Sequence, residues 1–306
     1  MTTESQLRAD IVEIGRRMYA RGYTASNDGN ISVRLGSERL LMTPKSVCKG
    51  FMTPDMMCIT DLSGQKLQGD RDPSSEMLMH LEVYRQRPDV QAVVHAHPPT
   101  ATGFAVAGIP LDRAVLAEVL TTLGSIPIAE YATPSTRELP EAVRKYIKAH
   151  DGMLLANHGA LTVGTDLYSA YYKMETIEHF AHISLVARIL GRENLISRDE
   201  VLRLQELRGT YGIKAPAPIC ATDDGMVLNQ ADCQVVQAPE SEGARLVPDV
   251  VRPSRESPSG RPPSIAANSP ANDAARRLDG PADDGEIRLT YRELSQLIEE
   301  AIKALR

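Results

Sequence analysis

The chain has 306 residues, 42% of them hydrophobic, which is ordinary for a globular protein and long enough to enclose a cavity. Its formal net charge of −6 excludes a general attraction to nucleic acid or to an anionic membrane, so a phosphorylated ligand needs a local site. We find no signal peptide, membrane span, paired metal-knuckle spacing or disulfide framework, and we expect a cytosolic protein whose thiols are reduced: Cys48, Cys58, Cys220 and Cys233.

Residues 1 to 214 alternate short helical and strand patterns, which indicates one α/β domain. An apolar residue recurs every three or four positions from Leu7 to Met18, which predicts a first helix over residues 5 to 20. The other helices are expected at residues 75–87, 139–149, 167–190 and 198–207. The strands are expected at residues 30–34, 40–43, 57–61, 92–97 and 153–156.

The composition changes after residue 214. Ten of the twenty prolines lie from Pro216 onward, and no aromatic residue occurs between Tyr211 and Tyr291. Such a segment buries too little apolar surface to offset its ordering entropy. We therefore interpret residues 215–286 as a largely disordered, proline-rich linker, although apolar residues between 219 and 236 leave that part open.

Residues 287–306 have the pattern of an amphipathic helix. Thr290 and Glu293 form a capping box, and an apolar stripe runs from Leu294 to Leu305. A helix this short is marginal alone in water, so the stripe needs a partner. It folds back onto its own domain, joins two assemblies, or docks as a tethered peptide in a groove on another protein.

The run Val-Val-His-Ala-His-Pro contains the strongest chemical signal. Alternate residues share one face of a strand, so His95 and His97 point into the same cavity. His158 follows an apolar strand in Ala-Asn-His-Gly, where α/β folds place site residues. Three neutral imidazoles with an open position form a catalytic site for Zn²⁺ or another divalent metal. We interpret His80, His150, His179 and His182 as packing or surface residues.

Three further segments offer groups for a phosphate and for proton transfer. Ser74, Ser75 and Glu76 open a helix, where free amides bind anions and a carboxylate can reach a substrate proton. Gly29 permits close approach of the backbone, and neighbouring amide side chains donate hydrogen bonds, as does the Lys-Ser pair after Met-Thr-Pro. An ordinary helix cap and an ordinary turn are the alternatives. These last candidates are Asn27, Gly29, Asn30, Lys45 and Ser46.

As a set, these segments resemble the class II aldolase/adducin family, and within it the fuculose-phosphate aldolases. The resemblance runs from about Leu7 to Gly212. It rests on Gly-Asn-Ile-Ser-Val-Arg (29–34), Met-Thr-Pro (42–44), Pro-Ser-Ser-Glu (73–76), Val-Val-His-Ala-His (93–97), Tyr-Ala-Thr-Pro-Ser-Thr-Arg-Glu-Leu (131–139) and Asn-His-Gly (157–159).

The resemblance implies a three-layer α/β/α domain around a mainly antiparallel sheet, in a homotetramer with active sites between subunits. It implies that His95, His97 and His158 bind zinc, and that Glu76 is the catalytic acid/base. The substrate would be fuculose or rhamnulose 1-phosphate, cleaved to dihydroxyacetone phosphate and lactaldehyde. The positions that would line its phosphate site are Asn27, Asn30, Lys45, Ser46, Ser74 and Ser75.

The match departs from the family at one catalytic position. Leu116 stands where fuculose aldolases have a proton-donating tyrosine from a neighbouring subunit; Tyr211 matches another tyrosine of that family, and Glu118 is a second candidate. A sugar-phosphate dehydratase or epimerase of the same fold is the enzymatic alternative, although the related epimerases have aspartate where this chain has Glu76. An adducin-like scaffold without the metal is the non-enzymatic alternative, and retention of the histidines opposes it.

The C-terminal extension lies outside that family's core. A proline-rich linker that ends in an amphipathic helix is similar to the encapsulation peptides of bacterial microcompartments. This resemblance implies a shell protein as the partner and a location inside a microcompartment, where a reactive aldehyde would be sequestered.

Overall fold

The computed structural model describes residues 2–211 and residue 213. The predicted linker (215–286), the predicted C-terminal helix (287–306), Cys220 and Cys233 lie outside the described residues. Cys48 and Cys58 are free thiols, as expected. No helix in the described part of the chain is long and apolar enough to cross a membrane.

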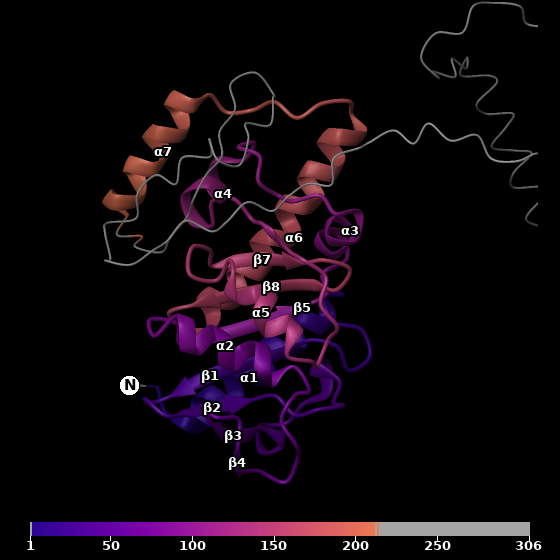
Figure 1. Ribbon diagram of the computed structural model, residues 1–306, viewed down its shortest axis with the longest axis vertical. Helices are drawn as coiled ribbons and strands as arrows, with labels where there is room; N and C mark the ends of the chain where they lie inside the picture. The colour runs from indigo at the N-terminus through magenta and orange to yellow at the C-terminus, as the bar shows by residue number, and fades with distance from the viewer. Residues whose placement is uncertain (1, 212, 214–306) are drawn as a thin grey trace, which may run out of the picture. The chain divides into compact units, whose positions relative to one another are not determined.

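Eight strands form a single sheet in the order β4-β3-β2-β1-β5-β8-β7-β6 (Figure 1). The strands are β1 (Asn30–Leu35), β2 (Arg39–Met42), β3 (Cys58–Asp61), β4 (Lys66–Gln68), β5 (Ala92–Ala96), β6 (Ile128–Ala129), β7 (Gly152–Leu155) and β8 (Gly159–Gly164). Every pair is antiparallel except β6 with β7, which is parallel. The expected mainly antiparallel sheet is thus confirmed, with one parallel pair at its edge.

Helices cover both faces of this sheet. They are α1 (Glu4–Ala20), α2 (Met77–Gln86), α3 (Pro99–Ala107), α4 (Ala117–Thr122), α5 (Glu138–Arg144), α6 (Leu167–Ile189) and α7 (Arg198–Thr210), with 3-10 turns η1 (Lys49–Phe51) and η2 (Pro54–Met56). One apolar core joins the sheet to α1, α3 and α6, and a second core joins the opposite face to α2 and α5. These are the three α/β/α layers that the sequence predicts.

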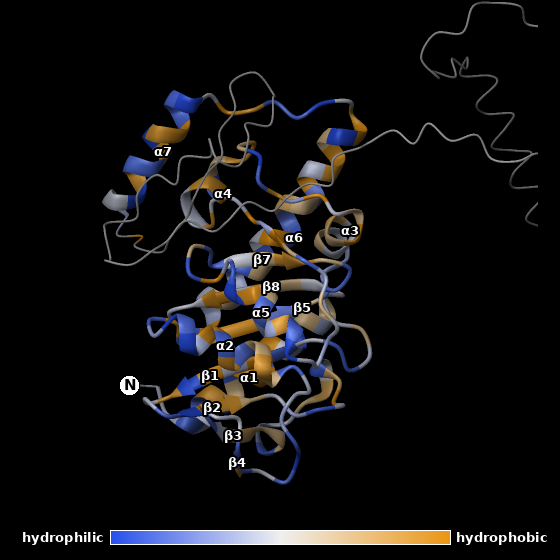
Figure 2. Cartoon of the chain, viewed as in Figure 1, coloured by the Kyte–Doolittle hydropathy of each residue, from blue (hydrophilic) through white to orange (hydrophobic). Residues whose placement is uncertain are grey.

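Side-chain alternation along the strands divides the residues between the two cores. In β5, Val94 and Ala96 belong to the core under α1 and α6, whereas Val93 belongs to the core under α2. His95 shares its face with Val93, and Asn30 and Ser32 of β1 occupy the same face. The polar residues of β1 and β5 are therefore directed toward α2, while the apolar positions of these strands appear as orange bands in Figure 2.

Most predicted elements are present, with small shifts at their ends. The first helix begins where Thr3 accepts a hydrogen bond from the Gln6 amide. The helix expected over residues 139–149 is shorter, because regular α5 ends at Arg144 and separate turns continue to His150. Three strands (β4, β6 and β8), two α-helices (α3 and α4) and the two 3-10 turns (η1 and η2) of the described residues lack a counterpart in the sequence-based expectations.

Candidate active site

The three predicted ligand histidines converge at the end of β5. His95 lies on β5, His97 follows directly after it, and His158 lies in the turn between β7 and β8. The ring centroids are 4.8 to 5.0 Å apart. One nitrogen from each ring lies within 4.8 Å of the others, so these side chains can hold one metal ion.

The outer nitrogens of these rings test whether the cluster fits a metal. His95 Nδ1 lies 2.9 Å from the Ala160 carbonyl oxygen, which can only accept, so Nδ1 carries the proton and Nε2 turns its lone pair inward. His97 Nδ1 faces the Asp28 carboxylate at 3.5 Å. His158 Nδ1 is buried and has no hydrogen-bond partner among the described residues. Inward lone pairs and backing acceptors fit a divalent ion with nitrogen ligands.

The pKa of His97 agrees with that fit, whereas at His95 burial is outweighed by the neighbouring Glu76, which raises the pKa. Burial, together with His95 and His158, lowers the pKa of His97 to about 3, so this ring is neutral at pH 7 as a metal ligand must be. His95 Nε2 and His97 Nε2 face each other at 3.1 Å. When each ring keeps its proton on Nδ1, both Nε2 lone pairs are available to a cation shared with His158.

Glu76 lies against the histidines at the beginning of α2. Its carboxylate oxygens are 3.2 Å from His95 Nε2 and 3.1 Å from His158 Nε2, and the Asn30 side-chain amide donates to it at 2.8 Å. Burial by itself raises the pKa of this carboxyl, but His95 and His158 outweigh burial and hold the pKa well below its usual range. Glu76 is therefore an ionised carboxylate beside the cluster, which is the state a general base requires.

Three loops that carry the phosphate candidates are tied together beside Glu76. Pro44 and Pro73 form a β-bridge, and the Ser74 amide donates to the Thr43 carbonyl at 3.2 Å. The Lys49 ammonium donates to the Asn27 carbonyl at 2.9 Å and to the Val47 carbonyl at 2.7 Å. The loops around residues 27–30, 43–47 and 73–76 thus meet at one place.

Strained backbone marks the same loops. Ser26 and Ser46 have φ values of 52° and 57°, and Asn157 beside His158 has 55°. Such left-handed conformations cost free energy for non-glycine residues and accumulate at functional sites. Gly29, at 72°, passes so close to β5 that a Cβ would lie 2.9 Å from the His95 carbonyl oxygen. Only glycine allows this turn to reach the histidines.

The remaining candidates are arranged as follows. Lys45, Ser46, Asn27 and Ser75 are exposed, whereas Asn30 and Ser74 are buried. Tyr211 is exposed at the end of α7, and α7 packs against α4, which carries Glu118 and begins after Leu116. The predicted proton donors therefore lie on the packed pair of helices α4 and α7, and not on the strands that carry the histidines.

The sequence pattern did not identify two residues of this region as part of the site. His80, interpreted as a packing or surface residue, is fully buried and contacts the site residue Asn30; Lys49 was not considered. The signal for His80 was its position four residues after Glu76, which places both on one face of α2. Lys49 gave no signal, because its acceptors are backbone carbonyls.

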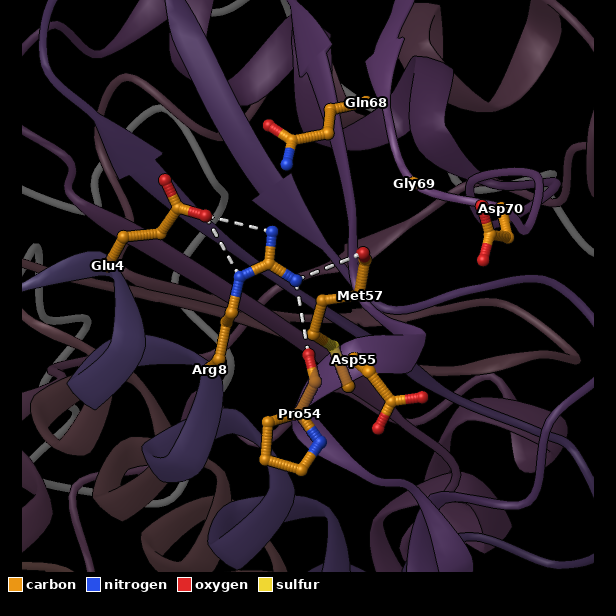
Figure 3. A pocket seen from close by; sticks show the side chains of 8 residues that line it. All are labelled: Glu4, Arg8, Pro54, Asp55, Met57, Gln68, Gly69 and Asp70. Atoms are coloured by element: carbon orange, nitrogen blue, oxygen red, sulfur yellow. Dashed lines mark hydrogen bonds and ion pairs between the residues drawn. The ribbon is translucent and has the colours of Figure 1, made fainter.

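A separate surface hollow shares no residue with this cluster. It lies between the start of α1 and the end of β4, and its only cation among the lining residues, Arg8, already pairs with Glu4 and donates to the Pro54 and Met57 carbonyls (Figure 3). With its guanidinium occupied and the acids Asp55 and Asp70 close by, this hollow offers little to an anionic substrate.

Comparison with known proteins places the chain in a family. The model of the class II aldolase and adducin N-terminal domain matches residues 9–185. The chain is 31% identical over 210 residues to a 3-oxo-tetronate 4-phosphate decarboxylase of Pectobacterium atrosepticum, covering 67% of this chain and 94% of that protein. It is 33% identical over 177 residues to an L-fuculose phosphate aldolase of Methanococcus maripaludis, covering 58% and 95%.

The same fold occurs in a solved structure of L-fuculose 1-phosphate aldolase, with a TM-score of 0.62 and 29% identity over 65% of this chain and 94% of that one. The family match, the fold and these relatives agree with the resemblance seen in the sequence motifs. The chain belongs to the class II aldolase/adducin family and is an enzyme of the lyase type.

Proposed function

We propose that this enzyme cleaves a ketose 1-phosphate, fuculose or rhamnulose 1-phosphate, to dihydroxyacetone phosphate and lactaldehyde. The proposal is based on the position of Glu76. Its ionised carboxylate lies between the histidine cluster and three joined loops that carry hydrogen-bond donors for a phosphate group. The named L-fuculose phosphate aldolases among its relatives support the substrate class.

Each group of residues has its own role in the proposed reaction. A divalent ion held by His95, His97 and His158, Zn²⁺ in this proposal, would supply Lewis-acid stabilisation of the enediolate charge. Asn27, Asn30, Lys45, Ser46, Ser74 and Ser75, with the backbone at Gly29, bind the phosphate and hold the reacting carbons beside the carboxylate. In cleavage, Tyr211 or Glu118 of a neighbouring subunit accepts the proton of the hydroxyl group that becomes the aldehyde oxygen as the carbon–carbon bond breaks. Glu76, in its protonated form, then gives a proton to the enediolate carbon to form dihydroxyacetone phosphate, and as a carboxylate it removes that proton in the reverse reaction.

The test is a coupled assay for dihydroxyacetone phosphate release from both ketose phosphates, with metal content measured on the same samples. Wild type should release the product, and Glu76→Gln should keep its metal but lose turnover by roughly 10²–10⁴-fold. A metal-loaded wild type that releases nothing would overturn the proposed substrate and favour the same-fold dehydratase or epimerase. A metal-free, inactive wild type would favour a scaffold.

Decarboxylation is a second candidate, and the relatives named 3-oxo-tetronate 4-phosphate decarboxylase favour it. Loss of carbon dioxide beside a ketone develops the same enediolate charge, so the cluster and the phosphate loops suit either reaction. The two functions differ in the product: carbon dioxide release from a 3-oxo-tetronate 4-phosphate, measured on the same enzyme sample, separates them.

We also propose that residues 1–214 are the catalytic domain of a homotetramer and that residues 215–286 tether residues 287–306, an encapsulation helix. The two relatives named above are matched over 94% and 95% of their own length by 67% and 58% of this chain, so the C-terminal third is additional to what they share. The capping box and apolar stripe in that third support a peptide that binds a microcompartment shell protein. Light scattering of the full chain tests the tetramer.

A further inference from the structure

A continuous row of hydrogen bonds runs from Tyr84, near the C-terminal end of α2, to the Glu76 carboxylate. Tyr84 Oη lies 3.0 Å from Ser32 Oγ, and Ser32 Oγ lies 2.6 Å from His80 Nδ1. His80 Nε2 lies 2.5 Å from Asn30 Oδ1, and Asn30 Nδ2 lies 2.8 Å from Glu76 Oε2. The row alternates between residues of α2 and β1 and ends at Glu76, the N-cap residue of α2.

The chemistry of the groups fixes the direction of every bond. The Asn30 side-chain NH₂ group donates to Glu76, so the Asn30 oxygen is turned toward His80. His80 Nε2 must then donate. In a neutral ring Nδ1 is the acceptor, so Ser32 donates to Nδ1 and Tyr84 donates to Ser32.

Burial keeps this direction constant with pH. His80 and Ser32 are fully buried, and Asn30 and Tyr84 are 3% exposed. Burial, with a contribution from His95, lowers the pKa of His80 to about 3, and burial raises the pKa of Tyr84. Neither group changes its charge near pH 7, so the row is a fixed scaffold.

We propose that His80 is a positioning residue that acts through Asn30: its Nε2–H holds the Asn30 amide so that both N–H groups face the active site. One N–H fixes Glu76 Oε2, and the second is available to an oxygen of the anionic substrate. Without this hold the Asn30 amide can rotate, and its oxygen would then face the carboxylate. The inference rests on the proposed lyase function for its kinetic consequences only.

The kinetic test is a double-mutant cycle in the full-length enzyme. His80→Leu, which retains bulk but cannot donate, should lower kcat roughly 10–100-fold while metal content stays unchanged. His80→Gln, whose amide can donate from nearly the place of Nε2, should recover most of that loss. Because His80 acts through Asn30, the double variant with Asn30→Ala should be no slower than Asn30→Ala alone.

Two controls separate positioning from packing. His150 is a half-buried histidine away from the cluster, with Nδ1 on the Ser125 carbonyl, and His150→Leu should leave kcat unchanged. Losses at His80 and Asn30 that multiply in the double variant, or a His80→Gln variant as slow as His80→Leu, would overturn the proposal.

A measurement that does not depend on catalytic activity separates this inference from the proposed function. In NMR spectra of full-length protein with ¹⁵N-labelled histidine, the His80 ring signal is identified as the one that disappears in His80→Gln. In wild type this signal should show a neutral ring with the proton on Nε2 between pH 5.5 and 8. This signal should move in Asn30→Ala. A proton on Nδ1, or a ring that titrates in that range, would refute the row even if the lyase is active. An inactive wild type with the expected signal would refute only the ketose phosphate substrate.

Discussion

Lys49 is the residue whose burial has the clearest energetic consequence. Its side chain is 2% exposed and donates to one carbonyl in each of two loops beside the cluster, at Asn27 and Val47. Burial lowers the pKa of its ammonium to about 8, although Cys48, Asp28 and Glu76 oppose the change. The fold therefore holds a cation at neutral pH at some cost in stability, and in return it joins two loops that carry residues proposed to bind the substrate phosphate.

This burial predicts how stability depends on pH. Between pH 8 and 10.5 the unfolded chain keeps the Lys49 proton and the folded chain releases it, so the free energy of unfolding rises with pH through that window. The rise is at most about 3 kcal/mol. Urea unfolding at pH 7.5, 9 and 10.5 should give a more positive slope of the free energy of unfolding against pH in wild type than in Lys49→Met, because the raised pKa of Cys58 lowers stability with pH equally in both proteins. Equal slopes in the two proteins would contradict the assignment.

At the scale of elements, the pairing of β5 with β8 brings the histidines together. Their register places His95 opposite Leu161 and Ala96 opposite Ala160. Gly159 begins β8 directly after His158, and a Cβ there would lie 2.5 Å from both the Ala96 carbonyl oxygen and His97 Cδ2. The strand pair can close around the cluster only because this position has no side chain.

Gly159→Ala should therefore separate the strands and misplace His97, which we expect to weaken metal binding roughly 10–100-fold, since ligand orientation depends on its supports. Competition titration with a chromophoric chelator measures the affinity. The matched control is Gly103→Ala in α3, where an added Cβ meets no atom within 4 Å, so its affinity should equal that of wild type. Unchanged affinity in Gly159→Ala would show that the strands can yield.

The sequence predicts some of these elements and contacts and not others. Five strands were predicted because their apolar residues lie between recognisable breaks. The strand β8 was missed because it begins and ends on glycine, a residue that is typical of turns and unfavourable in strands. Adjacent histidines were predictable from alternation along β5. The contact of His80 with Asn30 was not, because it joins residues 50 positions apart through a fold that a local pattern does not specify.

At the scale of the whole molecule, catalysis and the C-terminal extension should be separable. The described fold ends its last helix at Thr210, and the family match ends at residue 185, so deletion of residues 287–306 should leave kcat and KM as in wild type. The same deletion should abolish co-sedimentation with microcompartment shells. Unchanged co-sedimentation would refute the encapsulation role of the tail, and lost activity would show that the tail contributes to the active site.

The central claim is that His95, His97 and His158 hold the metal on which the lyase reaction depends. The most direct measurement is metal content together with dihydroxyacetone phosphate release, before chelation, after chelation and after Zn²⁺ is restored, in wild type and His158→Ala. We predict one ion per chain in wild type, activity that is lost on removal and returns on restoration, and neither metal nor activity in His158→Ala. Full activity in metal-free wild type, or a full complement of metal in His158→Ala, would contradict the account.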